Sequence, residues 1–248
     1  MIKLLINGFN GKMGQAVYTK AMELNEIEVV AGVDKFVTGE EKVPVFDDIS
    51  KINVDIDVII DFSIPIATFN ILEFAANKKI PVVVATTGFS AEEESKIEEY
   101  SKIIPIFKSA NMSYEVNLMA DLVAKVAKLL CDSDIEIVET HHNRKIDAPS
   151  GTAYMLANSI NEALDNEMKY EYDRHSKREK RDKKEIGIHS IRGGTVVGKH
   201  TVTFFGDNES FEITHNVTSR SVFANGAVKA AMFLADKEPG LYSMKNMF

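Results

Sequence analysis

The sequence predicts an α/β protein with two parts: a Rossmann-type domain with a doubly wound parallel sheet, and an α+β domain with an open, mainly antiparallel sheet. Up to about residue 110, short β-branched apolar runs alternate with helix-like stretches, which is typical of a parallel sheet covered by helices on both faces. Beyond that point, helices are followed by longer strand-like runs. A chain of 248 residues is long enough to bury two cores of moderate size.

The first domain is expected to comprise residues 1–111 and 220–248. Its sheet is predicted from five apolar runs that helical stretches separate. A largely apolar helix from about Ser221 to Asp236 is expected to dock back on this domain, so the C-terminal residues are assigned to it. The predicted strands are Ile2 to Ile6, Val29 to Val33, Val58 to Ile60, Val82 to Ala85 and Pro105 to Phe107.

The second domain is expected to comprise residues 112–219. Gly206, Asp207 and Asn208 are typical of a hairpin turn. The charged segment from Arg174 to Lys184 mixes both signs and has no interleaved aromatic residues, so we interpret it as a solvated loop rather than a nucleic-acid site. The predicted helices are about Ser113 to Leu130 and about Ser150 to Leu164, and the predicted strands are Ile135 to Glu139, Ile186 to Arg192, Val196 to Phe205 and Ser210 to Asn216.

Composition and charge narrow the classes of function. The net charge of −8 disfavours nucleic acid as a partner, and an anionic substrate would need a local basic pocket. No apolar run approaches the roughly 20 residues that cross a bilayer, and the N-terminus lacks the pattern of a secretory signal. We therefore expect a cytoplasmic protein with no membrane contact. The single cysteine, Cys131, cannot form an internal disulfide and is expected to be a small buried side chain.

Gly8, Gly11 and Gly14 lie in the expected turn between the first strand and the first helix. Glycine lets the backbone approach a pyrophosphate, and a helix N-terminus offers it unpaired N–H groups. The spacing G-x-x-G-x-x-G differs from G-x-G-x-x-G, so an ordinary tight turn is the alternative. Asp34, 20 residues after Gly14, favours a dinucleotide site because its carboxylate would bind the ribose hydroxyls. Lys35 would pair with a 2′-phosphate instead, so we expect both NADH and NADPH as cofactors.

A polar stretch from Glu139 to Ala153 follows a predicted strand and leads into a predicted helix. Adjacent residues of a strand point to opposite faces, so His141 and His142 are poorly placed to chelate a metal ion, and no metal site is expected. Histidine titrates near neutral pH and Lys145 adds a positive charge, which suits proton transfer and anion contact. The helix start at 150–152 (Ser-Gly-Thr) offers backbone donors to a carboxylate. Together these features predict a pocket for a small acid.

With these motifs the sequence resembles the 4-hydroxy-tetrahydrodipicolinate reductase (dihydrodipicolinate reductase) family. The resemblance covers nearly the whole chain. It is carried by Gly8 to Gly14, Asp61 to Ser63, Thr86 to Phe89, Asn111 to Ser113, Glu139 to Ala153, Ile186 to His189, Arg192 to Gly194, Gly198 to Val202, Ser219-Arg220, Phe223-Ala224 and Gly226-Ala227.

The resemblance implies an NAD(P)H-dependent oxidoreductase of the diaminopimelate route to lysine, assembled as a homotetramer through the second domain. The implied reaction is hydride delivery to the conjugated imine that forms when the 4-hydroxyl of a small dianionic substrate is lost as water. His141 corresponds to the family's proton donor and acceptor, and Lys145 to its second proton donor. His142, Gly151 and Thr152 would bind the substrate carboxylates. The implied cofactor-binding residues are Gly8, Phe9, Asn10, Gly11, Lys12 and Met13 near the pyrophosphate, Asp34 and Lys35 at the adenosine ribose, and Ala85, Thr86, Thr87, Ser109, Ala110, Asn111 and Met112 at the nicotinamide half.

Two residues depart from the family pattern. Ala85 and Glu115 stand where the family usually has glycine, and we expect both to affect cofactor affinity. The other histidines of strand-like runs, His189, His200 and His215, are expected to be packed or interfacial rather than catalytic.

Two other functions are compatible with parts of the sequence. A non-catalytic NAD(P) sensor would not need His141, Lys145 and the Ser-Gly-Thr helix start together, so the sequence favours an enzyme. The sequence distinguishes less well between the reductase described above and a related reductase that acts on a different small dicarboxylate imine. Arg192, judged alone, fits a salt-bridge partner, and Gly193-Gly194 beside it predict a loop whose backbone approaches another group.

Overall fold

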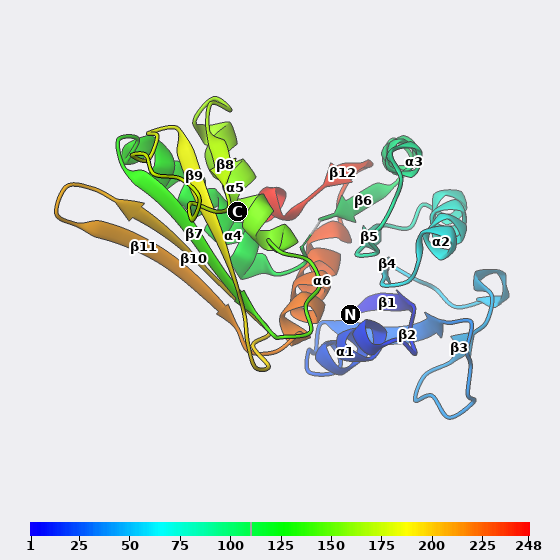
Figure 1. Cartoon of the computed structure of the whole chain (residues 1–248). Coiled ribbons are helices and arrows are strands. Elements are labelled where there is room, and N and C mark those ends of the chain that lie inside the picture. Colours follow the sequence, from blue (N-terminus) through cyan, green and yellow to red (C-terminus); the bar gives the residue numbers. More distant parts are fainter. Residues whose placement is uncertain (110) are drawn as a thin grey trace. The chain divides into compact units, whose positions relative to one another are not determined.

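The computed structural model describes residues 1–109 and 111–248. The chain forms two compact units (Figure 1). Unit 1 consists of Met1–Tyr114 and Ser221–Phe248, and unit 2 of Glu115–Arg220. Among the described residues, no helix is long and apolar enough to span a membrane, and no group of three or more His, Cys, Asp or Glu side chains is arranged to hold a metal ion.

Unit 1 contains a seven-stranded sheet whose strand pairs are all parallel, in the order β12-β6-β5-β4-β1-β2-β3. Each predicted strand of this domain is present. The edge strands β3 and β12 were not predicted, because two or three residues give too short an apolar run to stand out. The strands are β1 (Ile2–Asn7), β2 (Ile27–Val33), β3 (Val45–Phe46), β4 (Val58–Asp61), β5 (Val82–Val84), β6 (Pro105–Lys108) and β12 (Gly240–Tyr242).

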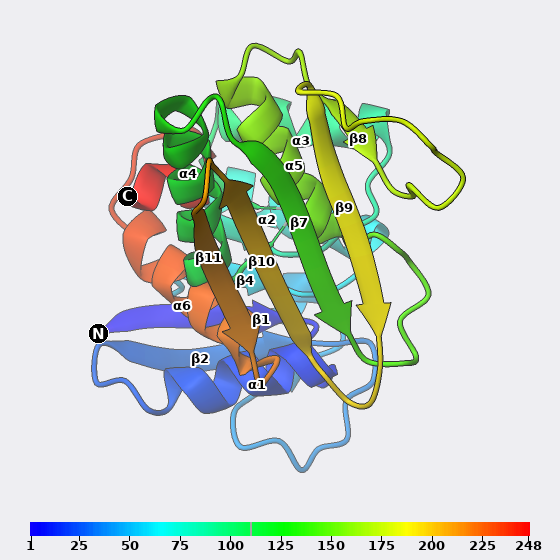
Figure 2. The same cartoon turned by 60° about the vertical axis from the view of Figure 1, so that its left-hand side comes forward.

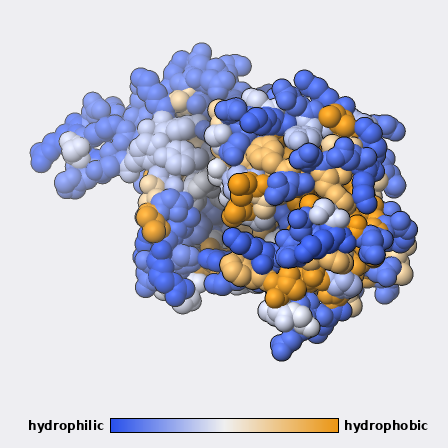
Figure 3. All heavy atoms as spheres, turned by 90° about the vertical axis from the view of Figure 1, so that its right-hand side faces the viewer, coloured by the Kyte–Doolittle hydropathy of each residue, from blue (hydrophilic) through white to orange (hydrophobic). Residues whose placement is uncertain are grey.

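Helices cover both faces of this sheet, as the doubly wound prediction requires. Successive β1 residues face opposite cores: Leu4 packs on the side of α1 and α6, and Leu5 on the side of α2. The last helix, α6, packs against α1 and three strands of the sheet, as predicted. The face that carries α2 and α3 mixes hydrophilic side chains with separate hydrophobic spots (Figure 3). The helices are α1 (Lys12–Ala21), η1 (Ile49–Lys51), α2 (Pro65–Lys78), α3 (Ala91–Ser101), α6 (Ser221–Leu234) and η2 (Met244–Met247).

Unit 2 contains a five-stranded sheet in the order β11-β10-β7-β9-β8 (Figure 2). The sheet is mixed: β10 runs antiparallel to both β11 and β7, whereas β7 pairs with β9, and β9 with β8, in parallel. β8 runs in the same direction as β7 because the chain crosses back through α5, and β9 runs parallel to both because the segment 172–184 returns the chain again. The elements are α4 (Tyr114–Leu129), β7 (Asp134–His141), α5 (Gly151–Ala163), β8 (Lys169–Glu171), β9 (Glu185–Arg192), β10 (Gly198–Phe205) and β11 (Ser210–Val217).

The alternation of buried and partly buried residues along β7 positions the candidate site of unit 2. Buried and partly buried residues alternate without interruption from Asp134 to His141. Ile135 and Ile137 occupy the buried face and pack against residues of α4 and α5. The same face continues with Glu139 and His141, so an acid and an imidazole lie at the end of an otherwise apolar row.

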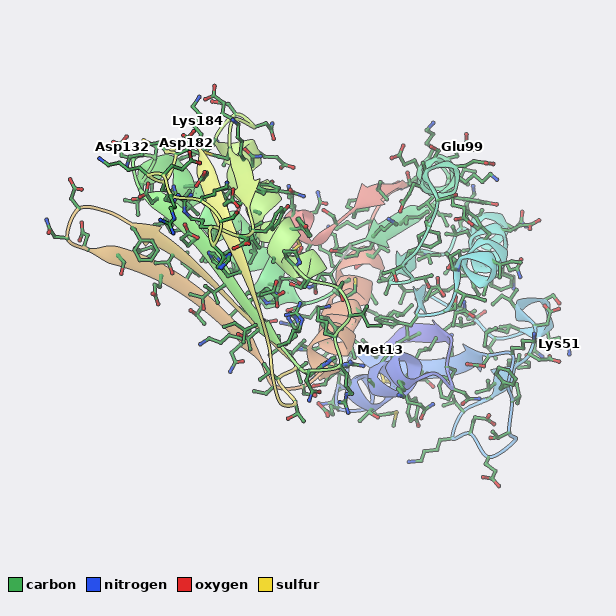
Figure 4. All side chains as sticks on the ribbon, viewed as in Figure 1. Met13, Lys51, Glu99, Asp132, Asp182 and Lys184 are labelled. Carbon is green, nitrogen blue, oxygen red and sulfur yellow. The ribbon has the colours of Figure 1, made fainter. Side chains whose placement is uncertain are left out.

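Two expectations for unit 2 concern residues outside the site. Cys131 is exposed, so the expectation of a buried side chain was wrong: α4 ends at Leu129, and Cys131 lies in the turn that follows. The charged segment from Arg174 to Lys184 is largely exposed, as expected for a solvated loop, and Asp182 and Lys184 are labelled near its end in Figure 4. Several of its cations pair with acids, as in the ion pair from Arg174 to Glu185 at 2.6 Å.

Candidate active site

The turn between β1 and α1 in unit 1 fits a dinucleotide pyrophosphate. Gly8 has φ +77°, and a Cβ there would lie 2.3 Å from the carbonyl oxygen of Phe62. At Gly14 a Cβ would lie 2.1 Å from the Gly8 oxygen, so only glycine allows α1 to approach the turn this closely. Gly11 is the N-cap of α1 and provides no side-chain cap, so the first N–H groups of the helix are available to an anion.

Asp34 organises the loop beside that turn. Its two carboxylate oxygens accept hydrogen bonds from the backbone N–H groups of Asn10 at 2.9 Å and Phe36 at 3.0 Å. Each oxygen keeps a lone pair for a ribose hydroxyl. Lys35 is exposed. The Asn10 side chain donates to Glu41 at 2.9 Å, which brings a second carboxylate close to this end of the site.

Sequence reasoning missed Glu41. The backbone N–H of Thr38 and the side chain of Asn10 donate to it, and these hydrogen bonds lower its pKa to about 2. Glu41 also lines a surface pocket of about 300 Å³ together with Phe9, Asn10, Tyr18 and Lys42. No sequence pattern points to Glu41, because it lies in an irregular loop between β2 and β3.

A buried carboxylate, Asp61, ties together the loops that follow β4 and β5. It accepts hydrogen bonds from Asn7 at 2.7 Å, from Ser63 and Thr68 at 2.5 Å, and from Thr86 at 2.9 Å. Burial raises the pKa of Asp61, although all four hydrogen bonds act in the opposite direction. The Thr86 hydroxyl also accepts from the Ser63 backbone at 2.9 Å, so its side chain has a structural function.

Local hydrogen bonds also fix the segment after β6. The carbonyl of Asn111 accepts from the Ser109 hydroxyl at 2.9 Å, and its side chain accepts from the Ser113 backbone at 2.8 Å. Met112 is buried, and a Cβ on Gly226 of α6 would lie 1.6 Å from its carbonyl oxygen. Ala110, also expected at the cofactor, lies outside the described residues. The remaining expected contacts in unit 1 divide by burial: the Phe9 side chain is in the core, Ala85 is buried, Met13 is half-buried at the start of α1 (Figure 4), and Lys12 and Thr87 are exposed.

In unit 2, His141 is held by the buried carboxylate of Glu139. Its Nδ1 lies 2.6 Å from Oε2 of Glu139, whose side chain is fully buried. Arg192 of β9 binds both oxygens of Glu139, each at 2.8 Å, in the bidentate geometry that favours an ionised carboxylate. A third donor to Glu139 is the backbone N–H of Ser150 at 3.1 Å.

These contacts set the charges of the cluster. Burial acts to raise the pKa of Glu139, but hydrogen bonds from Arg192 and His141 outweigh it and lower that pKa to about 2. Burial lowers the pKa of His141, and the nearby Lys145 and Arg192 act in the same direction against the attraction of Glu139. The imidazole is therefore mostly neutral at pH 7, and the carboxylate is charged.

The segment that leads from the end of β7 to α5 carries Lys145 and His142. Lys145 Nζ lies 2.8 and 2.9 Å from the two carboxylate oxygens of Asp147. Arg192 anchors this loop by donating to the Asp147 carbonyl at 2.6 Å. His142 is half-buried, and its Nδ1 is buried without a hydrogen-bond partner among the described residues. The Gly193 N–H donates to the carbonyl of His141 at 2.9 Å, so the expected close approach of the Gly193-Gly194 loop is to the end of β7.

Ser150 joins the start of α5 to β10. Its hydroxyl caps the helix by accepting from the Ala153 N–H at 3.1 Å, and it lies 2.9 Å from Nε2 of His200. His200 is buried, as expected for a packed histidine, and burial lowers its pKa to about 4. Gly151 is exposed and Thr152 is half-buried, and both lie on the first turn of the helix, where the helix dipole favours a carboxylate.

Comparisons with known proteins match this chain over almost its whole length. Residues 2–112 match the N-terminal family of dihydrodipicolinate reductase, and residues 115–248 match the C-terminal family. The chain belongs to the dihydrodipicolinate reductase family. A 4-hydroxy-tetrahydrodipicolinate reductase of Caldanaerobacter subterraneus is 53% identical over 247 residues, covering 100% of this chain and 98% of the relative. A second relative of that name, from Clostridium tetani, is 47% identical over 248 residues, covering 100% of this chain and 97% of its own.

Solved structures agree with this assignment. A dipicolinate-bound dihydrodipicolinate reductase from Paenisporosarcina sp. TG-14 is 26% identical, with a TM-score of 0.84, and each chain covers 100% of the other. Sequence analysis predicted His141, Lys145 and the start of α5 in one site. In the structure, Glu139 contacts both His141 and the Ser150 N–H at the start of α5, and Lys145 lies near enough to His141 to act on its pKa. The sequence analysis assigned no function to Glu139. Its position two residues before His141 could have indicated one, because residues two apart on a strand share one face.

Proposed function

We propose that this chain catalyses the NAD(P)H-dependent reduction of 4-hydroxy-tetrahydrodipicolinate to tetrahydrodipicolinate, in the diaminopimelate route to lysine. The cluster of His141 with the Glu139–Arg192 ion pair carries the proposal, because it provides an oriented imidazole at a strand end with the cations Arg192 and Lys145 nearby. The names of the relatives, and the dipicolinate bound to a similar structure, support the choice of a small dicarboxylate as substrate.

The residues of unit 2 suit a dianionic substrate. The N–H groups at the start of α5, on Gly151 and Thr152, bind one carboxylate with the help of the helix dipole. His142 and the Lys145 ammonium add donors from the loop before the helix. Lys145 is shared with Asp147, so an arriving carboxylate competes with that ion pair.

Proton transfer is the second requirement of the reaction. Loss of the 4-hydroxyl as water leaves a conjugated imine, and the bound dinucleotide supplies the hydride. Addition of the hydride places an electron pair on the substrate that must be protonated. His141 exchanges that proton through its imidazole, and Lys145 stabilises the developing negative charge and serves as the second proton donor.

Unit 1 supports use of both NADH and NADPH. Asp34 suits the ribose hydroxyls of NADH, and the exposed Lys35 suits the 2′-phosphate of NADPH. Glu41 adds a negative charge beside Asn10 and works against a phosphate at the same place. We infer that NADH binds more tightly, while NADPH remains a substrate.

We further propose that the protein is a cytoplasmic homotetramer. Both helices of unit 2 lie on one face of its sheet, which leaves the other face uncovered (Figure 2). Among exposed apolar residues of β9 and β10 are Ile191 and Phe205, which are 50% and 46% exposed. A second copy of the chain is the partner that symmetric assembly favours. Light scattering after gel filtration measures the mass directly, and a monomeric mass would contradict the assembly.

The reaction is tested by supplying the freshly made product of the preceding synthase with NADH or NADPH and following cofactor oxidation. We expect oxidation with both cofactors, and formation of tetrahydrodipicolinate in equal amount. Reactions without substrate measure the background. An absence of oxidation with either cofactor would overturn the proposed function, and activity only with another cyclic dicarboxylate imine would replace the substrate.

A further inference from the structure

Donors surround both carboxylate oxygens of Glu139, and the Ser190 side chain is one of them. Oε1 accepts from Arg192 Nη2 and from the Ser150 N–H, and Oε2 accepts from Arg192 Nη1 and lies against His141 Nδ1. An ionised carboxylate has about four lone-pair sites and no proton to give. Because Arg192 keeps its charge and binds both oxygens, Glu139 can only accept from His141.

This arrangement decides which nitrogen of His141 carries the proton. The Nδ1 atom must be a donor, since its partner is an acceptor at 2.6 Å. In the neutral imidazole, Nε2 is then the nitrogen with a free lone pair. No hydrogen bond from a described residue reaches Nε2, and a Cβ added to Gly198 would lie 3.1 Å from it. Glycine at that position keeps Nε2 uncovered.

We propose that Glu139, fixed by Arg192, is a positioning residue that holds the Nδ1 proton of His141 and makes Nε2 the atom that exchanges a proton with the substrate. The inference rests on the proposed function for its chemistry, but the tautomer is a property of the free protein. In the resting state, neutral His141 accepts a proton at Nε2, and only the imidazolium donates one. The Glu139 carboxylate stabilises that imidazolium and stays bound to Arg192 throughout.

Charged groups from several elements face His141. Glu139 on the same strand attracts a proton to it, whereas Arg192 on β9 and Lys145 on the following loop oppose protonation, as does burial. His200 on β10 stacks edge-on against it, with ring centroids 5.1 Å apart, and is neutral at pH 7 because burial lowers its pKa to about 4. Removal of Glu139 or of Arg192 should therefore move the His141 pKa in opposite directions.

The substitution Glu139→Gln makes a sharp test. A glutamine amide that keeps its oxygen toward Arg192 Nη2 and the Ser150 N–H must turn its NH₂ group toward His141. That NH₂ group is a donor, so Nδ1 must become the acceptor and the proton must move to Nε2. This orientation leaves one donor, Arg192 Nη1, facing the NH₂ group, whereas the opposite orientation would leave two, Arg192 Nη2 and the Ser150 N–H. We expect the tautomer to switch.

Nitrogen-15 NMR of histidine-labelled protein, with the His141 signals assigned through His141→Gln, measures both tautomer and pKa without substrate. We expect the Nδ1–H tautomer in the natural protein and Nε2–H in Glu139→Gln. The His141 pKa should fall by about one pH unit or more in Glu139→Gln and rise by a similar amount in Arg192→Met. Turnover of Glu139→Gln at pH 7 should fall by roughly tenfold or more, with little change in NADH affinity.

Glu136 offers a matched control on the same strand. It lies 2.7 Å from Nε2 of His189 and 3.1 Å from Arg181, but on the opposite face of β7. Glu136→Gln should leave the His141 tautomer and turnover unchanged. If Arg192→Met does not fold, Glu139→Gln/Arg192→Met, which removes both charges, replaces it and should retain the switched tautomer.

The outcomes separate the two proposals. An Nε2–H tautomer in the natural protein, or an unchanged tautomer and pKa in Glu139→Gln, would overturn the function of Glu139 whatever the enzyme reduces. A protein that shows the expected tautomers but does not oxidise NADH or NADPH with the substrate would overturn the proposed reaction and leave the positioning intact.

Discussion

Removal of the Arg192 side chain should destabilise the protein strongly, because it leaves the Glu139 carboxylate buried without its cation. Arg192 provides two of the donors to that carboxylate, both at 2.8 Å. Hydrogen bonds to charged groups contribute about 1.5–3 kcal/mol each, which gives ~3–6 kcal/mol for two. A separate estimate comes from buried ion pairs that lose one partner, which costs ~3–5 kcal/mol. We therefore expect Arg192→Met to lower the free energy of unfolding by about 3–5 kcal/mol at pH 7.

Urea unfolding at one fixed protein concentration measures this loss, because an oligomer's stability depends on concentration. The double variant Glu139→Gln/Arg192→Met removes both charges and should lose less than Arg192→Met alone. A loss below about 1 kcal/mol for Arg192→Met, or strictly additive losses in the double variant, would refute the view that a buried charge causes the effect.

The same reasoning fixes the pH dependence of stability. The pKa of Glu139 is lowered from 4.5 to about 2 in the folded protein, so its contribution is fully present above about pH 4.5 and is lost as the pH falls toward 2. Without Arg192 that folded-state pKa rises, and the loss should begin at a higher pH. Identical acid-unfolding curves for both proteins would contradict the assignment.

Three further predictions concern catalysis and cofactor binding. His141→Gln should lower the turnover number by roughly 10²-fold or more, in the range usual for acid–base catalysis, with a smaller effect on the dissociation constant of NADH; near-normal turnover would exclude its catalytic function. Lys35→Ala should raise the Michaelis constant for NADPH more than for NADH, and equal effects would exclude pairing with a 2′-phosphate. Gly14→Ala should weaken NADH binding by at least about tenfold in a fluorescence titration, because its Cβ meets the Gly8 oxygen at 2.1 Å; Gly206→Ala, whose nearest neighbour is 3.6 Å away, serves as the control.

Local patterns predicted most of the fold and part of the site. The β-branched runs of unit 1 and the glycines after β1 are visible in consecutive residues, and so is the polar stretch before α5. The pairing of Glu139 with Arg192 joins residues 53 positions apart. It depends on the parallel register that sets His141 opposite Arg192, and one sequence does not reveal that register.

Asp61 and Glu139 show why the surroundings of a buried carboxylate, rather than burial itself, decide its chemistry. Both side chains are fully buried at or near the end of a strand, and both accept several hydrogen bonds. The described donors to Asp61 are all neutral groups, and burial raises its pKa. Glu139 is bound by Arg192, and its pKa is lowered to about 2. Asp61 is thus suited to fixing loops, whereas Glu139 keeps a permanent charge beside His141 that can control where the imidazole holds its proton.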